Sequence, residues 1–338
     1  MTSMFKLLFT IILILIFFTP LVTGEYPVLG KIHRLTDDIN KLIPASAKLE
    51  KLAEGFEWSE GPVWTPEGKF LLFSDIPKNT IYKWTGSEGI SIYIRPAGYS
   101  GSDPAGKELG TNGLTFDPEG NLVVCDHGNR CISRINTEIF TREIIVDKFQ
   151  DKRLNSPNDL VIKSNGDIYF TDPPYGLEGL DKSPKKELDF NGVYLIRKSG
   201  ELILLTKEMT RPNGIGLSPD ERILYVAQSD AKDPIWRSFD VKSDGTIEHS
   251  RIFFDAKILR KEGLRGGPDG LVIDSAGNIW ATGPGGVHIL SPKGEHLGWI
   301  ETGQATANCT FGGDGSTLYI TADMLLCRIQ TNTKGIGF

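Results

Sequence analysis

Apolar residues from Leu49 onward occur in short runs and do not follow a helical spacing. Phe70-Leu71-Leu72-Phe73 and Leu122-Val123-Val124 are examples, and clusters of Gly, Asn, Asp, Ser and Pro separate such runs. Strand-forming residues bounded by turn-forming residues are typical of antiparallel β-structure. Because no long stretch shows the helical period of about 3.6 residues, the pattern predicts an all-β protein.

One strand–turn–strand unit recurs along this part of the chain. Each copy begins with an acidic or amide residue, followed within a few positions by an apolar run, a tight turn and a second apolar run. The six copies begin near Glu60, Asn112, Asn158, Asn213, Asp269 and Asn308. The copies start roughly 40 to 55 residues apart, which is the spacing of four-stranded propeller blades. We therefore predict a six-bladed β-propeller, because a β-sandwich with a second domain would not explain six equivalent units.

The N-terminal stretch has a different composition. A single Lys precedes an almost purely aliphatic and aromatic run, and Val22 and Gly24 suit a cleavage site before Glu25. This layout is typical of a secretory signal peptide. We predict a signal peptide over residues 1–24, a leader over 25–45 and the propeller over 46–338. An uncleaved membrane anchor is the alternative, because the apolar run approaches the roughly 20 residues of a span.

Charge and cysteine content narrow the choice of partners. The formal net charge is -6 and no basic cluster is present, so a nucleic-acid partner is not expected. The export prediction permits disulfides among Cys125, Cys131, Cys309 and Cys327. Cys125 and Cys131 could face each other across a hairpin, or all four could be buried thiols. The sequence predicts a periplasmic or secreted protein that is a monomer or a weak dimer.

The residues that begin the six units should converge at the propeller axis, since the innermost strands surround a central tunnel. All six carry oxygen donors in carboxylate or carboxamide groups. Hard cations prefer such donors, and Ca²⁺ accepts six to eight of them. Other divalent cations such as Mg²⁺, Mn²⁺ or Zn²⁺ are alternatives. A single Asn or Asp would usually satisfy a turn backbone, but Glu60 is a poor turn residue, and the regularity favours a metal site.

Several of these motifs resemble those of the gluconolactonase / senescence marker protein (regucalcin) family, in particular its bacterial gluconolactonase branch. The resemblance covers nearly everything from about residue 50 to 330. It rests on Ser59-Glu60-Gly61-Pro62, Ser156-Pro157-Asn158-Asp159, Arg211-Pro212-Asn213-Gly214, Gly267-Pro268-Asp269-Gly270 and Thr171-Asp172-Pro173-Pro174-Tyr175-Gly176. The family is a six-bladed propeller with a divalent cation, usually Ca²⁺, in its tunnel. The resemblance implies that Glu60, Asn158, Asn213 and Asp269 bind the metal and that Asn112 contacts the substrate.

The function that follows from the resemblance is metal-dependent hydrolysis of sugar lactones such as glucono-1,5-lactone. We expect Asp269 to act as the general base, with Glu60 as the alternative base, while Arg211 and His127 are further candidates for substrate binding. Two other functions stay open. The protein could hydrolyse other lactones or phosphotriesters, or it could be a recognition propeller in which Ca²⁺ only stabilises the inner strands.

Overall fold

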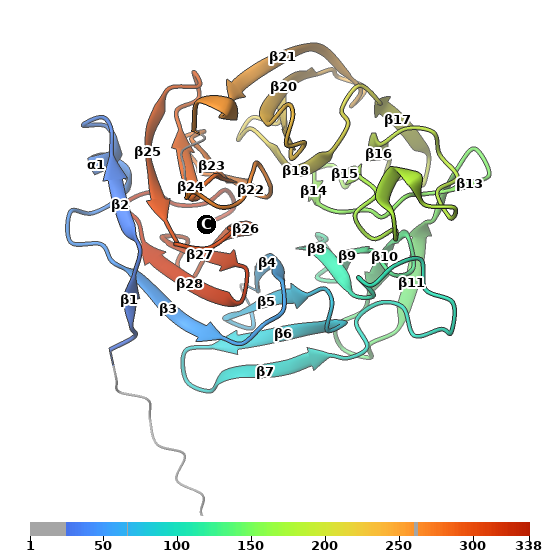
Figure 1. Cartoon of the computed structure of the whole chain (residues 1–338), viewed down its shortest axis with the longest axis horizontal. Helices are drawn as coiled ribbons and strands as arrows, with labels where there is room; N and C mark the ends of the chain where they lie inside the picture. The colour runs from blue at the N-terminus through green and yellow to red at the C-terminus, as the bar shows by residue number, and fades with distance from the viewer. Residues whose placement is uncertain (1–24, 66, 260–262) are drawn as a thin grey trace, which may run out of the picture.

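The computed structural model describes residues 25–65, 67–259 and 263–338. Six of its sheets are arranged as blades around a central axis (Figure 1), and a separate two-stranded sheet forms a small hairpin. Within each blade, strands that are consecutive in sequence form an antiparallel meander, and blades five and six gain further strands from the N-terminal residues. The predicted six-bladed β-propeller is therefore confirmed. The predicted signal peptide over residues 1–24 lies outside the described residues.

The strands of each blade follow one another in chain order from the axis to the rim, except in blade six, whose outer strand comes from the N-terminal part of the chain. Blades one and two comprise β4 (Ser59–Thr65), β5 (Phe70–Asp75), β6 (Thr80–Thr85), β7 (Gly89–Ile94), β8 (Thr111–Phe116), β9 (Leu122–Asp126), β10 (Cys131–Ile135) and β11 (Arg142–Val146). Blades three and four comprise β14 (Leu160–Ile162), β15 (Ile168–Asp172), β16 (Gly192–Ile196), β17 (Leu202–Thr206), β18 (Pro212–Leu217), β19 (Ile223–Gln228), β20 (Ile235–Val241) and β21 (Ile247–Asp255). Blades five and six comprise β22 (Leu271–Ile273), β23 (Ile279–Gly283), β24 (Gly286–Leu290), β25 (His296–Glu301), β26 (Asn308–Gly312), β27 (Thr317–Ala322) and β28 (Leu325–Gln330).

Blade six takes its fourth strand from the other end of the chain. β3 (Leu49–Glu54) pairs antiparallel with β28, so a strand that precedes blade one completes the last sheet and closes the ring. The residues before β3 also join the sheets. β1 (Val28–Leu29) pairs with β3 in blade six, and β2 (Lys31–Arg34) pairs with β25 at the rim of blade five. Closure of this kind covers sheet edges that would otherwise be open to pairing.

The apolar core lies between neighbouring blades. Tyr169 and Val193 of blade three pack with Ile215 and Leu224 of blade four in one buried cluster. The next cluster joins blades four and five and includes Trp236, which is fully buried. A four-stranded blade cannot cover both of its own faces, so these contacts make the blades depend on one another.

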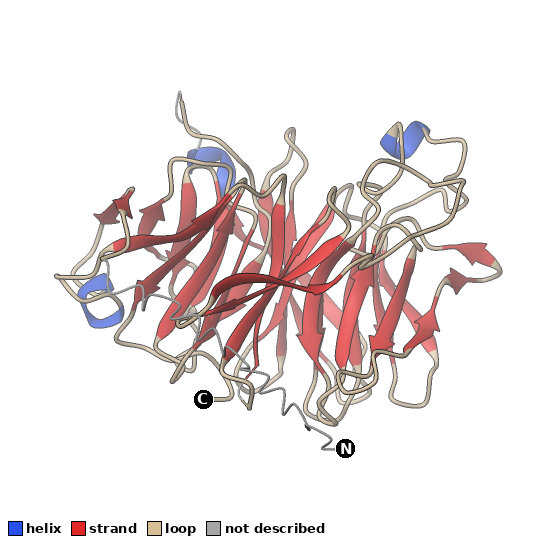
Figure 2. Cartoon of the chain, turned by 90° about the horizontal axis from the view of Figure 1, so that it is seen from below, coloured by secondary structure: helices blue, strands red, loops and turns tan. Residues whose placement is uncertain are grey.

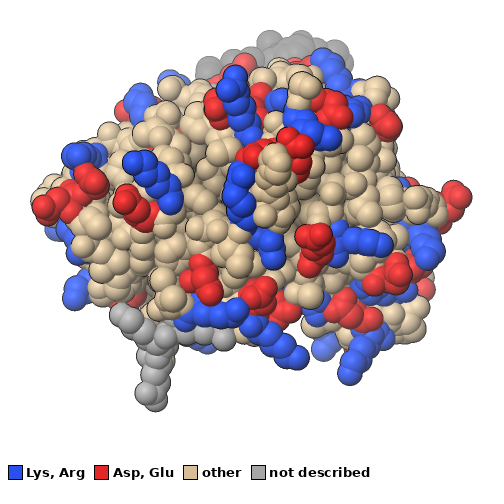
Figure 3. Space-filling view, turned by 90° about the horizontal axis from the view of Figure 1, so that it is seen from above, with Lys and Arg blue, Asp and Glu red and all other residues tan. Residues whose placement is uncertain are grey.

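The loops and short helices complete the ring. The helical segments are α1 (Ile39–Leu42), η1 (Leu180–Lys182) and η2 (Ala256–Leu259), and a small hairpin consists of β12 (Lys148–Phe149) and β13 (Lys152–Arg153). Loops rise above the upper side of the ring in Figure 2, and the C-terminus lies on its lower side. In the part of the chain that the structure describes, no helix has the length and apolar character needed to cross a membrane. Acidic and basic side chains are interspersed on the face in Figure 3.

The four cysteines are buried free thiols. Cys125 lies opposite Ile132 in the β9–β10 ladder, and Cys131 lies opposite Asp126. The two thiols therefore do not face each other across the hairpin, and the buried-thiol alternative holds.

Candidate active site

A cavity of about 180 Å³ lies at the start of the inner strands. Its lining includes five of the six residues that begin the sequence repeats, together with one residue from the β9–β10 turn and five others. The lining residues are Trp58, Glu60, Ile76, Glu108, Asn112, His127, Asn158, Tyr175, Asn213, Ser229 and Asp269. The tertiary structure thus brings together residues from five different blades. Pockets for drug-sized ligands have volumes of roughly 300–1,000 Å³. This cavity is smaller, so it suits a ligand smaller than a typical drug.

Irregular pairing at the start of the inner strands sets the direction of these side chains. The register with the second strand shifts between Glu60 and Val63 in β4, and between Thr111 and Leu114 in β8. β18 has a similar shift between Pro212 and Ile215. A bulge bends the strand locally and re-aims the side chains next to it. In these three blades, the inner strand is therefore irregular next to the repeat residue.

Glycines follow four of the repeat residues, and each allows the next blade to approach closely: Gly61, Gly113, Gly214 and Gly270. A Cβ on Gly214 would lie 2.1 Å from the carbonyl oxygen of Asp269, so no side chain fits there. The amide of Gly214 donates a hydrogen bond of 3.1 Å to that same carbonyl. The amide of Gly113 donates in the same way to Asn158, at 2.8 Å. These bonds connect the backbones of the candidate ligands from blade to blade.

Hydroxyl groups from the second strands support this ring of backbone contacts. Ser74 of blade one donates a hydrogen bond of 2.8 Å to the carbonyl of Asn112 in blade two. Thr171 of blade three donates one of 2.8 Å to the carbonyl of Asn213 in blade four. These two hydroxyls hold the backbone of Asn112 and Asn213 from the preceding blade. Thr171 thus has an architectural role between blades three and four.

Three buried carboxyl groups lie near one another at the axis. Burial raises the pKa of Glu60, and the nearby Asp159 raises it further. Burial also raises the pKa of Asp269, with added contributions from Glu60 and Asp159. The pKa of Asp159 rises to about 7 through burial. No Lys or Arg lines this cavity in the described parts of the chain, so the carboxylates have no cationic side chain to balance them.

This arrangement fits a divalent cation. Carboxylate and carboxamide groups line the cavity, and within the described residues its carboxyl groups have no Lys or Arg among the lining residues. Within residues 25–65, 67–259 and 263–338, no group of three or more His, Cys, Asp or Glu side chains is placed to hold a metal. The candidate ligands differ from such a group because only two of the four are carboxylates. They are the carboxylates of Glu60 and Asp269 and the carboxamides of Asn158 and Asn213. Oxygen ligands of this type suit Ca²⁺, which also accepts water in its shell.

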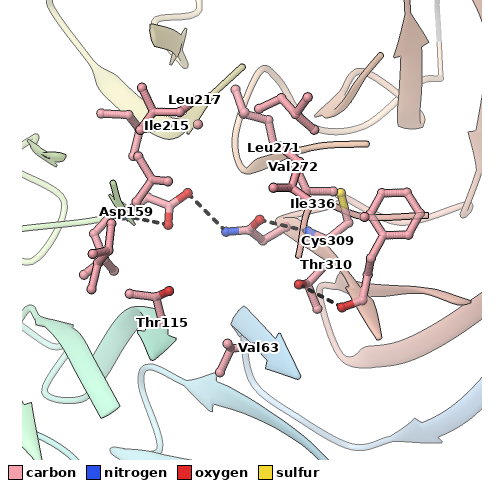
Figure 4. Close-up of a pocket in the computed structure, with 18 of the residues that line it drawn as sticks. Val63, Thr115, Asp159, Ile215, Leu217, Leu271, Val272, Cys309, Thr310 and Ile336 are labelled. Atoms are coloured by element: carbon pink, nitrogen blue, oxygen red, sulfur yellow. Dashed lines mark hydrogen bonds between the residues drawn. The ribbon is translucent and has the colours of Figure 1, made fainter. Parts of the chain in front are cut away.

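Asn308, the sixth repeat position, points elsewhere. It does not line the cavity, and its Nδ2 lies 3.2 Å from Oε2 of Glu60 and 3.5 Å from Oδ2 of Asp159. Asn308 and Asp159 also line a second, more apolar cavity of about 320 Å³ further along the inner strands (Figure 4). Asn308 therefore connects the two buried carboxyl groups.

Several lining residues were not predicted from the sequence. Glu108 comes from the loop before β8, and its Oε2 lies 2.8 Å from Nδ1 of His127. Tyr175 also lines the cavity, and its hydroxyl lies 2.5 Å from that of Ser229. None of these residues occupies a repeat position. The Pro173-Pro174 turn before Tyr175 is the only local signal that a rigid segment is held there.

Arg211, a predicted substrate-binding residue, is not among the lining residues. Its Nη2 lies 2.5 Å from Oδ2 of Asp181 in the loop that contains η1. Its Nη1 donates a hydrogen bond to the carbonyl of Thr210. The structure thus places Arg211 beside a loop and outside the cavity, whereas His127 and Asn112 are inside it. A substrate contact by Arg211 stays a prediction.

Comparisons with known proteins agree with this architecture. A family model for the SMP-30/Gluconolactonase/LRE-like region matches residues 58–323. A gluconolactonase of Zymomonas mobilis is 43% identical over 316 residues, which cover 91% of this chain and 88% of that protein. A solved structure described as a putative gluconolactonase has a TM-score of 0.80 and 31% identity, covering 91% of this chain and 100% of its own. A gluconolactonase from Xanthomonas campestris has a TM-score of 0.77 and 29% identity, with 92% and 99% coverage.

Proposed function

Because the chain belongs to the SMP-30/gluconolactonase/LRE-like family, as a gluconolactonase-like carboxylic ester hydrolase, we propose that it hydrolyses sugar lactones such as glucono-1,5-lactone. The observation that carries this proposal is the convergence of Glu60, Asn158, Asn213 and Asp269 on one small cavity. The product would be the open-chain aldonic acid.

Glu60, Asn158, Asn213 and Asp269 would hold a divalent cation, for which we propose Ca²⁺. Such a cation, when bound, supplies Lewis acidity to the lactone carbonyl and stabilises negative charge on its oxygen. The glycine contacts and hydroxyl contacts described above hold the backbone of these residues in place. Preorganised ligands of this kind do not need to move during the reaction.

Asp269 is the proposed general base. Its carboxylate takes a proton from a water molecule while the water oxygen forms a bond to the carbonyl carbon. The ring C–O bond then breaks, and the proton passes from Asp269 to the ring oxygen, which becomes a hydroxyl group. The water has then supplied the new oxygen of the carboxylic acid, the proton on that acid and the proton on the former ring oxygen, so no further reactant is needed.

Glu60 is less suited to this step. Its Oε2 accepts a hydrogen bond of 2.5 Å from the amide of Gly61 and one of 3.2 Å from Asn308. These contacts stabilise the ionised form and hold the carboxylate in one orientation. Binding of a cation also favours the ionised form of Asp269, which weakens it as a base. Asp269 nevertheless has fewer competing hydrogen bonds, with Asn213 as its side-chain donor.

The test is a continuous assay of acid release from glucono-1,5-lactone. The wild type should be active with Ca²⁺ and lose its activity in a chelator, and added Ca²⁺ should restore it. Asp269→Asn should lower kcat by about 100-fold or more, since general base catalysis contributes typically 10²–10⁴-fold. Asp314→Asn, which changes an exposed turn residue between β26 and β27, is the matched control and should keep wild-type activity.

The outcomes separate the alternatives. Full activity of Asp269→Asn with bound metal would mean that another group is the base. A wild type that binds Ca²⁺ but opens no lactone would favour the recognition propeller. A panel that contains other lactones and phosphotriesters then decides the substrate class.

We also propose that the protein is exported to the periplasm or secreted, with cleavage before Glu25. This proposal rests on the apolar N-terminal run and the small residues at Val22 and Gly24. The mass of the mature protein, purified from the medium or periplasm, checks it. A mass that includes residues 1–24 would favour the membrane-anchor alternative.

A further inference from the structure

Three polar side chains form a chain of hydrogen bonds from the cavity rim to its interior. Oε2 of Glu108 lies 2.8 Å from Nδ1 of His127, and Nε2 of His127 lies 3.2 Å from Nδ2 of Asn112. The side chain of Glu108 is 34% exposed, while His127 and Asn112 are buried. The three residues come from the loop before β8, from the turn after β9 and from β8 itself. None of them is among the four candidate metal ligands.

The order of donors and acceptors from Glu108 through His127 fixes the orientation of the Asn112 carboxamide. An ionised carboxylate only accepts hydrogen bonds, so Glu108 keeps the proton of a neutral His127 on Nδ1. Nε2 of His127 is then an acceptor, and Asn112 must present its NH₂ group to it. The carboxamide oxygen of Asn112 is thereby turned away from His127, and this oxygen is buried without a partner.

No donor among the described residues forms a hydrogen bond to the oxygen of Asn112. Glu60 and Asp269, when ionised, present only acceptors. A buried acceptor without a partner is unfavourable, so a ligand that brings a donor is selected over one that does not. A hydroxyl group of a sugar lactone is such a donor, whereas an unsubstituted lactone has none.

We propose that Glu108 and His127 are positioning residues that hold the oxygen of Asn112 as an acceptor for a lactone hydroxyl group. The pair thereby makes the site selective for hydroxylated lactones. The substrate part of this inference rests on the proposed function, but the orientation of the Asn112 carboxamide does not. The two parts can therefore be tested separately.

The first test measures the tautomer of His127 by ¹⁵N NMR of the histidine side chains, without any substrate. The neutral form of His127 in wild type should carry its proton on Nδ1. Glu108→Ala should lose this preference, whereas Glu108→Gln should keep it because the amide oxygen can still accept from Nδ1. The protein contains five His residues, and a spectrum of His127→Phe assigns the signal. A proton on Nε2 in wild type, or an unchanged tautomer in Glu108→Ala, would overturn the orientation.

The second test compares glucono-1,5-lactone with δ-valerolactone, which has no hydroxyl groups. Glu108→Ala should raise KM for gluconolactone about tenfold, the effect of losing one hydrogen bond, with a smaller change in kcat. The same variant should change kcat/KM for δ-valerolactone less than twofold. Glu108→Gln should restore the gluconolactone KM. Glu143→Ala, an exposed acidic residue of β11 in the same blade, is the control.

Different failures give different results. Equal losses on both lactones, or a weaker affinity for Ca²⁺ in Glu108→Ala, would overturn the selectivity role. If wild type hydrolyses neither lactone, the proposed function fails and the selectivity role fails with it. The NMR result still decides whether Glu108 and His127 orient Asn112.

Discussion

Asn213 and Asn308 occupy the same position in two repeats, yet their surroundings differ. Asn213 lines the cavity, and its carbonyl is held by Thr171 of the preceding blade. Asn308 donates to Glu60 and Asp159 instead, so its amide is already engaged. At the scale of single residues, the same side chain can serve as a candidate ligand or as a bridge. The neighbouring residues decide between these roles.

His288 gives a prediction about pH at this scale. It lies in β24 with Nδ1 3.1 Å from Nε2 of His296, and Nε2 2.9 Å from the carbonyl of Pro284. Burial, together with His296, lowers the pKa of His288 from 6.5 to about 3. In the unfolded chain His288 therefore binds a proton below about pH 6.5, whereas in the folded protein it binds one only below about pH 3. Stability is retained above this window and falls with decreasing pH inside it, by about 1.4 kcal/mol per pH unit.

Chemical unfolding between pH 7 and pH 4 measures this effect. His288→Gln should lose less stability than wild type as the pH falls, because its side chain cannot be protonated. His249→Gln removes an exposed His and should keep the wild-type dependence. Parallel curves for wild type and His288→Gln would contradict the assignment.

Strands β3 and β28 give the propeller its closure at the scale of elements. The sixth repeat supplies only three strands, and the fourth comes from a segment about 270 residues away in sequence. Leu49 of β3 is buried in a cluster with Ile39 and Ile43 from the segment around α1. The N-terminal residues therefore hold blade six through both backbone pairing and side-chain packing.

Leu49→Ala should destabilise the protein by about 2–5 kcal/mol, because it leaves a cavity among buried apolar side chains. The midpoint of urea unfolding measures the change. Leu35→Ala, at a position that is 53% exposed, should change stability by no more than about 0.5 kcal/mol. Equal midpoints for the two variants would mean that β3 contributes little to ring closure.

The ring as a whole determines which groups are protected from solvent. All four thiols lie in strands that are covered by neighbouring strands or blades. Burial raises the pKa of Cys131 to about 12 and that of Cys327 also to about 12. Only a thiolate reacts readily, so the folded protein should resist thiol reagents.

A titration with an aromatic disulfide reagent tests this protection. The native protein should react with it extremely slowly, and the unfolded protein should release four equivalents, one for each Cys. A reducing agent should not alter the unfolding midpoint. Fast reaction of one thiol under native conditions would show that its blade opens locally.

The number of blades and the kind of oxygen donor at the start of each inner strand follow from local sequence patterns. Alternating strand and turn residues are local signals, and the repeat places one carboxylate or carboxamide at the start of each unit. The positions of Glu60, Asn112, Asn158, Asn213 and Asp269 in the cavity could be predicted in this way.

Contacts that depend on closure of the ring, or on where the loops lie, arise only in the tertiary structure. It brought Glu108 and Tyr175 into the cavity from segments outside the repeat, turned Asn308 toward Glu60 and Asp159, and completed blade six with β3. No local pattern records these contacts, because they join residues that are distant in sequence. They form only when neighbouring blades cover each other's apolar faces.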